Sequence, residues 1–237
     1  MHTLALFLSL ISKNMYPTPL ISAILLAGGK GTRLKSAIPK QFLPLGSKPL
    51  ALHSFELLAK SDLITEIIVV CESFYRHLFN SKTPVKIGFA NPGLRRQDSV
   101  SNGLAQITKG SFVCIHDAAR PFLQLDDLKK VIEQALIHKA AALAIPAKNT
   151  IKEIDSTSFV RQTLNREILR ETLTPQVILL DLLKKGLLEA EKKKIDVTDD
   201  VSAIELMGHM VKLVSGKSSN IKITSPEDLQ LAQSFLK

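Results

Sequence analysis

The sequence predicts an α/β protein with a three-layer, doubly wound and mainly parallel sheet. Strand-like runs alternate with helix-like segments along the chain, and the strand-like runs are continuously apolar, which is typical of strands covered on both faces. The segments between them repeat apolar residues every three or four positions, as helices do. Because the 237 residues are 45% hydrophobic, the chain can bury a sizeable core, and one main domain is expected.

Six apolar runs are the expected strands, at residues 21–27, 65–71, 85–90, 111–116, 141–147 and 211–216. Helices are expected in LALHSFELLAKS, RQDSVSNGLAQI, LDDLKKVIEQALIHKA, LLDLLKKGLLEAEKK and DDVSAIELMG. Several of these stretches open with Asp or Ser, residues that cap helix N-termini. Sheets of this type bind ligands at the carboxyl ends of their strands, so the site is expected there.

Residues from about 148 to 174 interrupt this alternation. NTIKEI and SFVRQTL are short alternating runs around a DST turn, which predicts a protruding β-hairpin arm that contacts a partner. We find no internal repeat, low-complexity tract or linker, so residues 21–237 are expected to form one domain that carries this arm.

Residues 1–20 are expected to be a dispensable extension. MHTLALFLSLI has the apolar length of a signal peptide, but it lacks a basic n-region and an A-x-A site, and it is too short to span a bilayer. Met15 is a candidate initiator because the first convincing strand begins at Ile21. A signal peptide is the less favoured alternative.

Cysteine usage and charge limit the compartment and the partners. Cys71 and Cys114 lie in apolar runs without CxxC or His spacing, which favours reduced, buried thiols and a cytoplasmic location.

The net charge of +9 fits a partner that is nucleic acid, an anionic membrane or a small polyanion. Aromatic residues make up 5% of the chain, Trp is absent, and the KKK run at 192–194 continues a predicted helix. Neither nucleic acid nor a membrane is therefore the expected partner.

The clearest chemical signal is LLAGGKGTRLKSAIPKQF, residues 25–42. Glycines after a strand let backbone amides approach an anion, and a following helix N-terminus adds its dipole. A Walker A pattern does not fit, and Leu34 replaces the third glycine of a dinucleotide fingerprint, so an ordinary βα turn is the alternative. Arg33, Lys35 and Lys40 favour a polyphosphate ligand because spaced cations can neutralise several phosphates.

This loop resembles the signature of the Rossmann-like, glycosyltransferase-A-like nucleotidyltransferases. The motifs that follow it resemble, in the same order, those of the 2-C-methyl-D-erythritol 4-phosphate cytidylyltransferase family: RRQDSVSNGL, HDAARPF, KNTIK, LTPQ, TDDVSAIE and SNIKITSPEDL. The resemblance covers residues 21–237, and the short spacing from Arg33 to Lys40 favours this branch over hexose-1-phosphate nucleotidyltransferases. It implies transfer of the cytidylyl group of CTP to 2-C-methyl-D-erythritol 4-phosphate, with release of pyrophosphate, in the non-mevalonate pathway to isoprenoid precursors.

The resemblance also implies roles for single residues. Arg33 and Lys40 stabilise the transition state on the CTP phosphates, and Asp117 binds Mg²⁺, the implied cofactor. Arg166 and Lys222 are implied to be catalytic because they position the polyol phosphate. The remaining implied contacts are to CTP for Ala27, Gly28, Gly29, Gly31, Gly93, Ser99 and Asp117, and to the polyol phosphate for Thr150 and Thr198.

Plainer interpretations exist for several of these residues. Asp117 is alternatively a turn cap beside a core histidine, and we interpret His116 as structural. Ser99 is alternatively a helix N-cap. Thr150 and Arg166 are alternatively residues of a solvated arm, whereas the family implies a homodimer in which the arm reaches the neighbouring subunit's site.

Two departures and two other functions remain open at this point. With Leu26 and Gly28, the glycine loop resembles that of the wider superfamily, and Leu94 stands where the family can have an acidic residue.

A ribitol-5-phosphate cytidylyltransferase is the alternative enzyme. A non-catalytic nucleotide-binding regulator is less favoured because the acid and the loop cations are all present.

Overall fold

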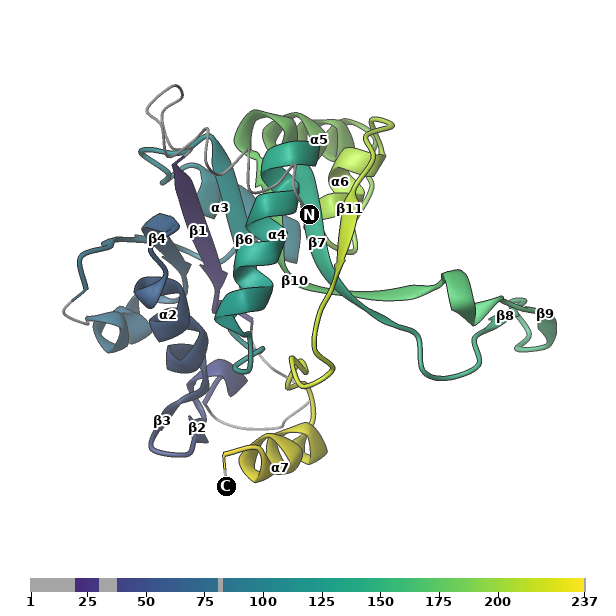
Figure 1. Cartoon of the computed structure of the whole chain (residues 1–237), viewed down its shortest axis with the longest axis horizontal. Coiled ribbons are helices and arrows are strands. Elements are labelled where there is room, and N and C mark those ends of the chain that lie inside the picture. The colour runs from purple at the N-terminus through teal and green to yellow at the C-terminus, as the bar shows by residue number, and fades with distance from the viewer. Residues whose placement is uncertain (1–19, 30–37, 81–82, 237) are drawn as a thin grey trace, which may run out of the picture.

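The computed structural model describes residues 20–29, 38–80 and 83–236. Within them, seven strands form the central sheet in the order β11-β7-β10-β6-β1-β4-β5 (Figure 1). Strand β10 runs antiparallel to its neighbours β6 and β7, and the other pairs are parallel. The strands are β1 (Ile21–Leu26), β4 (Ile64–Val70), β5 (Lys86–Ala90), β6 (Phe112–Asp117), β7 (Ala140–Pro146), β10 (Arg170–Leu179) and β11 (Lys212–Ser215).

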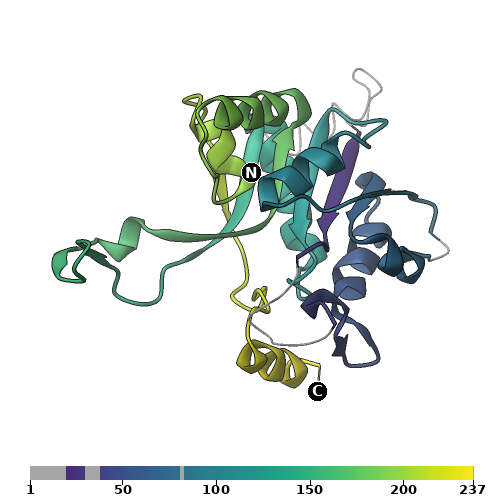
Figure 2. The same cartoon turned by 180° about the vertical axis from the view of Figure 1, so that it is seen from behind.

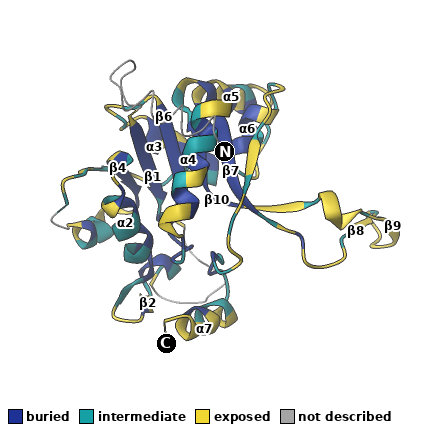
Figure 3. Cartoon of the chain, in the orientation of Figure 1, coloured by how far each residue is buried: buried dark blue, intermediate teal, exposed yellow. Residues whose placement is uncertain are grey.

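Helices pack on both faces of this sheet, which confirms the three-layer, doubly wound prediction (Figures 1 and 2). Apolar residues of each helix point toward the strands, and the sheet between them is buried (Figure 3). One face carries α2 (Leu50–Lys60), the 3-10 helix η3 (Ser73–Phe79) and α4 (Leu125–His138), and the other carries α3 (Arg96–Leu104), α5 (Leu180–Lys192) and α6 (Asp200–Glu205).

All six predicted strands and all five predicted helices are present, but β10 was not predicted. Strand β10 ends at Leu179 and α5 begins at Leu180, so no Gly, Pro or polar turn separates the two elements. Their apolar residues therefore form one continuous run in the sequence, which the helical pattern of α5 dominates.

The predicted hairpin arm is present and protrudes from the body (Figures 1 and 3). Strands β8 (Lys152–Ile154) and β9 (Val160–Thr163) pair antiparallel, and every residue in them is exposed. At the base of the arm, which was predicted at about 148–174, β10 pairs with β7 from Arg170 onward. Dimerisation through the arm stays a prediction.

The C-terminal segment returns to the end of the sheet where β1 and β6 finish (Figure 1). Its helix α7 (Pro226–Ser234) packs beside the small hairpin of β2 (Pro44–Leu45) and β3 (Lys48–Pro49). Ser225 caps α7 by accepting a hydrogen bond from the amide of Asp228. A separate apolar cluster fixes this segment, formed by Leu45, Leu50, Ala119, Ile223 and Ala232.

The cysteines agree with the prediction of buried thiols. Cys71 and Cys114 are both buried and free, and burial raises their pKa values to about 11 and about 12. Both thiols are therefore protonated at neutral pH and poor nucleophiles. Among the helices of the described ranges, none combines the length and apolar character needed to cross a membrane.

Candidate active site

Asp117, the last residue of β6, lies at the centre of the candidate site. Its Oδ2 is 2.7 Å from Nζ of Lys222, and its Oδ1 is 3.3 Å from Nη2 of Arg96. Burial alone would raise the pKa of this carboxyl group, but the charges of Arg96 and Lys222 hold it well below its usual range. Asp117 is therefore an ionised carboxylate at the carboxyl end of a central strand, where the sequence predicted a ligand site.

Arg96 also binds a second carboxylate that the sequence analysis did not select. Its Nη1 and Nη2 donate to Oδ1 and Oδ2 of Asp200 at 2.8 and 2.7 Å, and the Asp200 side chain is only 1% exposed. Both residues lie in motifs that the sequence analysis quoted, RRQDSVSNGL and TDDVSAIE. The adjacent arginines and aspartates were the available signal, but nothing in the sequence says which arginine faces which acid.

The segment around Lys222 is held by bonds from two other loops. Lys40 donates from Nζ to the carbonyl of Ile223 at 2.8 Å, and Arg120 donates from Nη1 to the carbonyl of Asn220 at 2.9 Å. The Ile223 amide donates to the carbonyl of Ala119 at 2.9 Å. Lys40, a predicted catalytic residue, therefore contacts the short segment that carries a second one, Lys222, which pairs with Asp117.

His116 has the structural role that the sequence analysis gave it. It is fully buried, with Nε2 3.2 Å from the carbonyl of Arg120 and Nδ1 3.0 Å from Oγ1 of Thr174. Burial lowers the pKa of His116 to about 4, so the ring is neutral at pH 7. Thr174, from the LTPQ motif, also accepts a hydrogen bond from the amide of Asp117 at 3.1 Å. This pair holds the end of β6 in place.

The glycine loop follows β1 and is described as far as Gly29; Gly31 and Arg33 lie outside the described residues. A Cβ at Gly28 would stand 2.3 Å from Cβ of Pro92, so only glycine fits where this loop passes the loop after β5. Among the described residues, none would lie within 4 Å of a Cβ at Gly29. None of the described side chains therefore blocks the approach of an anion to the backbone at Gly29.

Gly93 and Ser99 lie beside the glycine loop. The Gly93 amide donates to Oγ of Ser99 at 2.9 Å, and a Cβ at Gly93 would be 2.3 Å from Cβ of Asp98. The N-cap of α3 is Arg95, so the alternative reading of Ser99 as an N-cap was wrong. Ser99 instead fixes the loop that contacts Gly28, and its contact with CTP stays a prediction.

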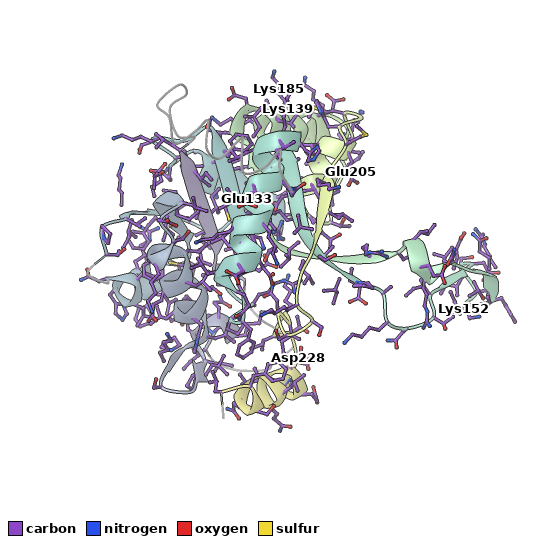
Figure 4. All side chains as sticks on the ribbon, in the orientation of Figure 1. Glu133, Lys139, Lys152, Lys185, Glu205 and Asp228 are labelled. Carbon is purple, nitrogen blue, oxygen red and sulfur yellow. The ribbon has the colours of Figure 1, made fainter. Side chains whose placement is uncertain are left out.

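The remaining predicted residues, Thr150, Arg166 and Thr198, are exposed. Thr198 directly precedes Asp199, the N-cap of α6. Thr150 and Arg166 are on the arm, where Arg166 donates from Nη1 to the carbonyl of Lys148 at 2.9 Å. In Figure 4, Lys152 marks this arm, well away from the body of the molecule.

The described residues contain no group of three or more His, Cys, Asp and Glu side chains placed to hold a metal ion. Mg²⁺ in proteins commonly takes one or two carboxylates and completes its shell with substrate oxygens and water, so a set of this size would suffice.

Comparison with known proteins shows which proteins this chain is similar to. Residues 21–237 match the family model described as "IspD: 2-C-methyl-D-erythritol 4-phosphate cytidylyltransferase". The chloroplastic 2-C-methyl-D-erythritol 4-phosphate cytidylyltransferase of Oryza sativa subsp. japonica is 45% identical over 222 residues, covering 91% of this chain and 74% of the relative. The enzyme of the same name from Chlamydia pneumoniae is 44% identical over 215 residues, covering 91% and 98%.

A solved structure shows the same fold. The crystal structure of 4-diphosphocytidyl-2C-methyl-D-erythritol synthase from Anaerococcus prevotii has a TM-score of 0.83 at 28% identity, covering 92% of this chain and 99% of that chain. The structure from Francisella tularensis has a TM-score of 0.78 at 30% identity, covering 91% and 99%.

Proposed function

Because the chain belongs to the 2-C-methyl-D-erythritol 4-phosphate cytidylyltransferase family, we propose that it transfers the cytidylyl group of CTP to 2-C-methyl-D-erythritol 4-phosphate. The products are 4-diphosphocytidyl-2-C-methyl-D-erythritol and pyrophosphate, on the route to isoprenoid precursors. The observation that carries this proposal is that Lys222 pairs with Asp117 while Lys40 binds the carbonyl of the next residue, Ile223.

The chemistry of the reaction explains why cations surround the site. A phosphate monoester has a second pKa of about 6, so the attacking oxygen is already deprotonated at neutral pH and no general base is needed. The obstacle is the repulsion between this dianion and the triphosphate, which grows as water is excluded. Lys40 and Lys222 supply fixed positive charge where both anions meet, so catalysis is by positioning and electrostatic stabilisation.

We propose Asp117 as the ligand of Mg²⁺. Its carboxylate fits because it stays ionised, and Mg²⁺ commonly takes one or two carboxylates and completes its shell with phosphates and water. When bound, the ion offsets charge on the triphosphate. Asp117→Asn should therefore raise the Mg²⁺ concentration needed for half-maximal rate, and an unchanged Mg²⁺ dependence would exclude this assignment.

We propose that the arm forms a homodimer and completes the partner's site. Four large apolar side chains on it are exposed: Ile154 at 52%, Phe159 at 73%, Val160 at 57% and Ile168 at 78%. Isolated chains rarely expose such a concentration of apolar surface, so a second copy is the expected cover. Thr150 and Arg166 then reach the polyol phosphate from the neighbouring subunit.

Mixing two inactive variants tests the shared site. Lys40→Ala damages the body and Arg166→Ala damages the arm. If the arm serves the partner, subunit exchange yields mixed dimers with one intact site each, and the mixture recovers about a quarter of the wild-type rate, because half the dimers are mixed and each has one working site of two. No recovery despite proven exchange would place Arg166 in its own subunit's site.

The buried, unpaired cysteines support a reducing compartment, and we propose the cytoplasm.

A direct assay tests the activity itself. The protein is incubated with Mg²⁺, one of the four nucleoside triphosphates, and either 2-C-methyl-D-erythritol 4-phosphate or ribitol 5-phosphate, and pyrophosphate is measured. Release is expected with CTP and the methylerythritol substrate. If pyrophosphate were released with ribitol 5-phosphate but not with 2-C-methyl-D-erythritol 4-phosphate, ribitol 5-phosphate would be the substrate instead.

A further inference from the structure

Gln41 joins the glycine loop to the rest of the site through its side-chain amide. Its Nε2 donates to the carbonyl of Ala27 at 2.6 Å and to the carbonyl of Gly29 at 2.8 Å. The residue is only 4% exposed. Both acceptors are carbonyl oxygens, so the NH₂ end of the amide must face them, and its two N–H groups match the two bonds.

The residues on either side of Gln41 fix its position. All three lie in the 3-10 helix η2 (Lys40–Phe42), whose first residue binds the carbonyl of Ile223. The ring of Phe42 stacks on Tyr75, with centroids 3.8 Å apart, and meets Phe79 edge-on at 6.3 Å. The short helix is therefore anchored in the core by Phe42, and Gln41 is held rigidly beneath the loop.

These two bonds determine which way the loop backbone faces. In a trans peptide the carbonyl and the following N–H point in opposite directions. With the Ala27 carbonyl turned toward Gln41, the Gly28 N–H is turned away from it. A loop that binds phosphate through backbone amides needs its carbonyls directed away from the anion in this way.

We propose that Gln41 is a positioning residue that holds the glycine loop in the conformation that binds the CTP phosphates. The inference rests on the proposed function. Gln41 itself need not touch the substrate; it satisfies two loop carbonyls so that the loop presents its amides and keeps a fixed distance from Lys40. An amide is required because a carboxylate offers no donor and would repel both carbonyls.

Steady-state kinetics of Gln41→Glu and Gln41→Met provide the test. Both variants should lower kcat/KM for CTP by roughly 10- to 100-fold, since a misplaced loop costs about this much, while KM for the polyol phosphate changes less than about threefold. Gln41→Glu should recover relative to wild type as the pH falls from 8.5 to 6, because a protonated carboxyl group regains one donor. Gln41→Met should show no such recovery.

A matched variant controls for the change of charge. Gln124 also donates its amide to a backbone carbonyl, that of Phe122, but it is exposed and forms the N-cap of α4. Gln124→Glu should retain wild-type kinetics at every pH. Thermal unfolding of each variant checks that the fold is intact.

Two results overturn the inference: folded Gln41→Glu and Gln41→Met within threefold of wild type, or equal pH profiles for all variants. A different result would count against the proposed function, namely a wild-type protein that releases no pyrophosphate. In that case hydrogen–deuterium exchange at Gly28 still tests the clamp, because both variants should exchange faster there than wild type if Gln41 holds the loop. Unchanged exchange at Gly28 would also overturn the inference.

Discussion

The buried fork between Arg96 and Asp200 gives a quantitative test of how the site is held together. Arg96→Met removes both bonds to Asp200, which the protein buries almost completely. Leaving one partner of a buried ion pair uncompensated typically costs 3–5 kcal/mol. Arg96 is itself 27% exposed, so water can partly replace it and the lower end of this range, about 3 kcal/mol, is expected.

Urea unfolding followed by circular dichroism measures this loss. With a slope of about 3 kcal/mol per molar urea for a chain of this size, the midpoint should fall by about 1 M. Adjacent Arg95 is the matched control, because its ion pairs with Asp98 and Asp196 are solvent-exposed. Arg95→Met should leave the midpoint nearly unchanged.

The pH dependence of the same variant has a definite sign. Burial raises the pKa of Asp200, and the charge of Arg96 opposes this rise. Without Arg96 the folded-state pKa rises further above the unfolded value of about 3.9. A raised carboxyl pKa gives stability that is present below the unfolded pKa and lost as the pH rises through the folded pKa. The loss of unfolding free energy caused by Arg96→Met should therefore be larger at pH 8 than at pH 5. A midpoint loss below about 0.3 M, or one that is equal at both pH values, would refute this reasoning.

Three other outcomes are expected. Lys40→Ala should lower kcat by about two to three orders of magnitude without unfolding the protein, and a normal kcat would contradict its role. Gly28→Ala should lower the free energy of unfolding by about 1–3 kcal/mol because its Cβ meets Pro92, whereas Gly29→Ala should not; equal effects would be evidence against the close approach. Burial opposes ionisation of Glu66, but hydrogen bonds from Ser22 and from residues 108 and 109 lower its pKa. The ionised Glu66 therefore stabilises the folded protein above the unfolded-state pKa, and this stability is lost as the pH falls through the folded-state pKa. Glu66→Gln should therefore flatten acid unfolding, and an unchanged acid limb would exclude this role.

Much of the fold and part of the site follow from local sequence. The six predicted strands are recognisable because each apolar run is bounded by turn residues or by a polar helix face. Asp117 is recognisable because it ends such a run. Its environment is not, because Lys222 lies more than a hundred residues away in the sequence and only the tertiary fold brings it within 2.7 Å.

The role of Gln41 is also not recognisable from the sequence. In the sequence it is one polar residue beside a lysine, and nothing distinguishes it from a solvated glutamine. Its importance arises from burial and from two backbone acceptors, Ala27 and Gly29, which become visible only when the loop has folded over it. Sequence patterns identify side chains that carry charge more readily than side chains that hold the backbone.

The unpredicted strand and the unpredicted ion pair have one cause. Strand β10 inserts between β6 and β7 and presents Thr174 to the amide of Asp117. Two residues further along, Gln176 accepts hydrogen bonds from the amides of Asp200 and Val201 and so fixes the start of α6. One antiparallel strand thus positions both carboxylates that Arg96 binds. Since β10 merges with α5 in the sequence pattern, the sequence does not reveal the strand that holds the two acids around Arg96.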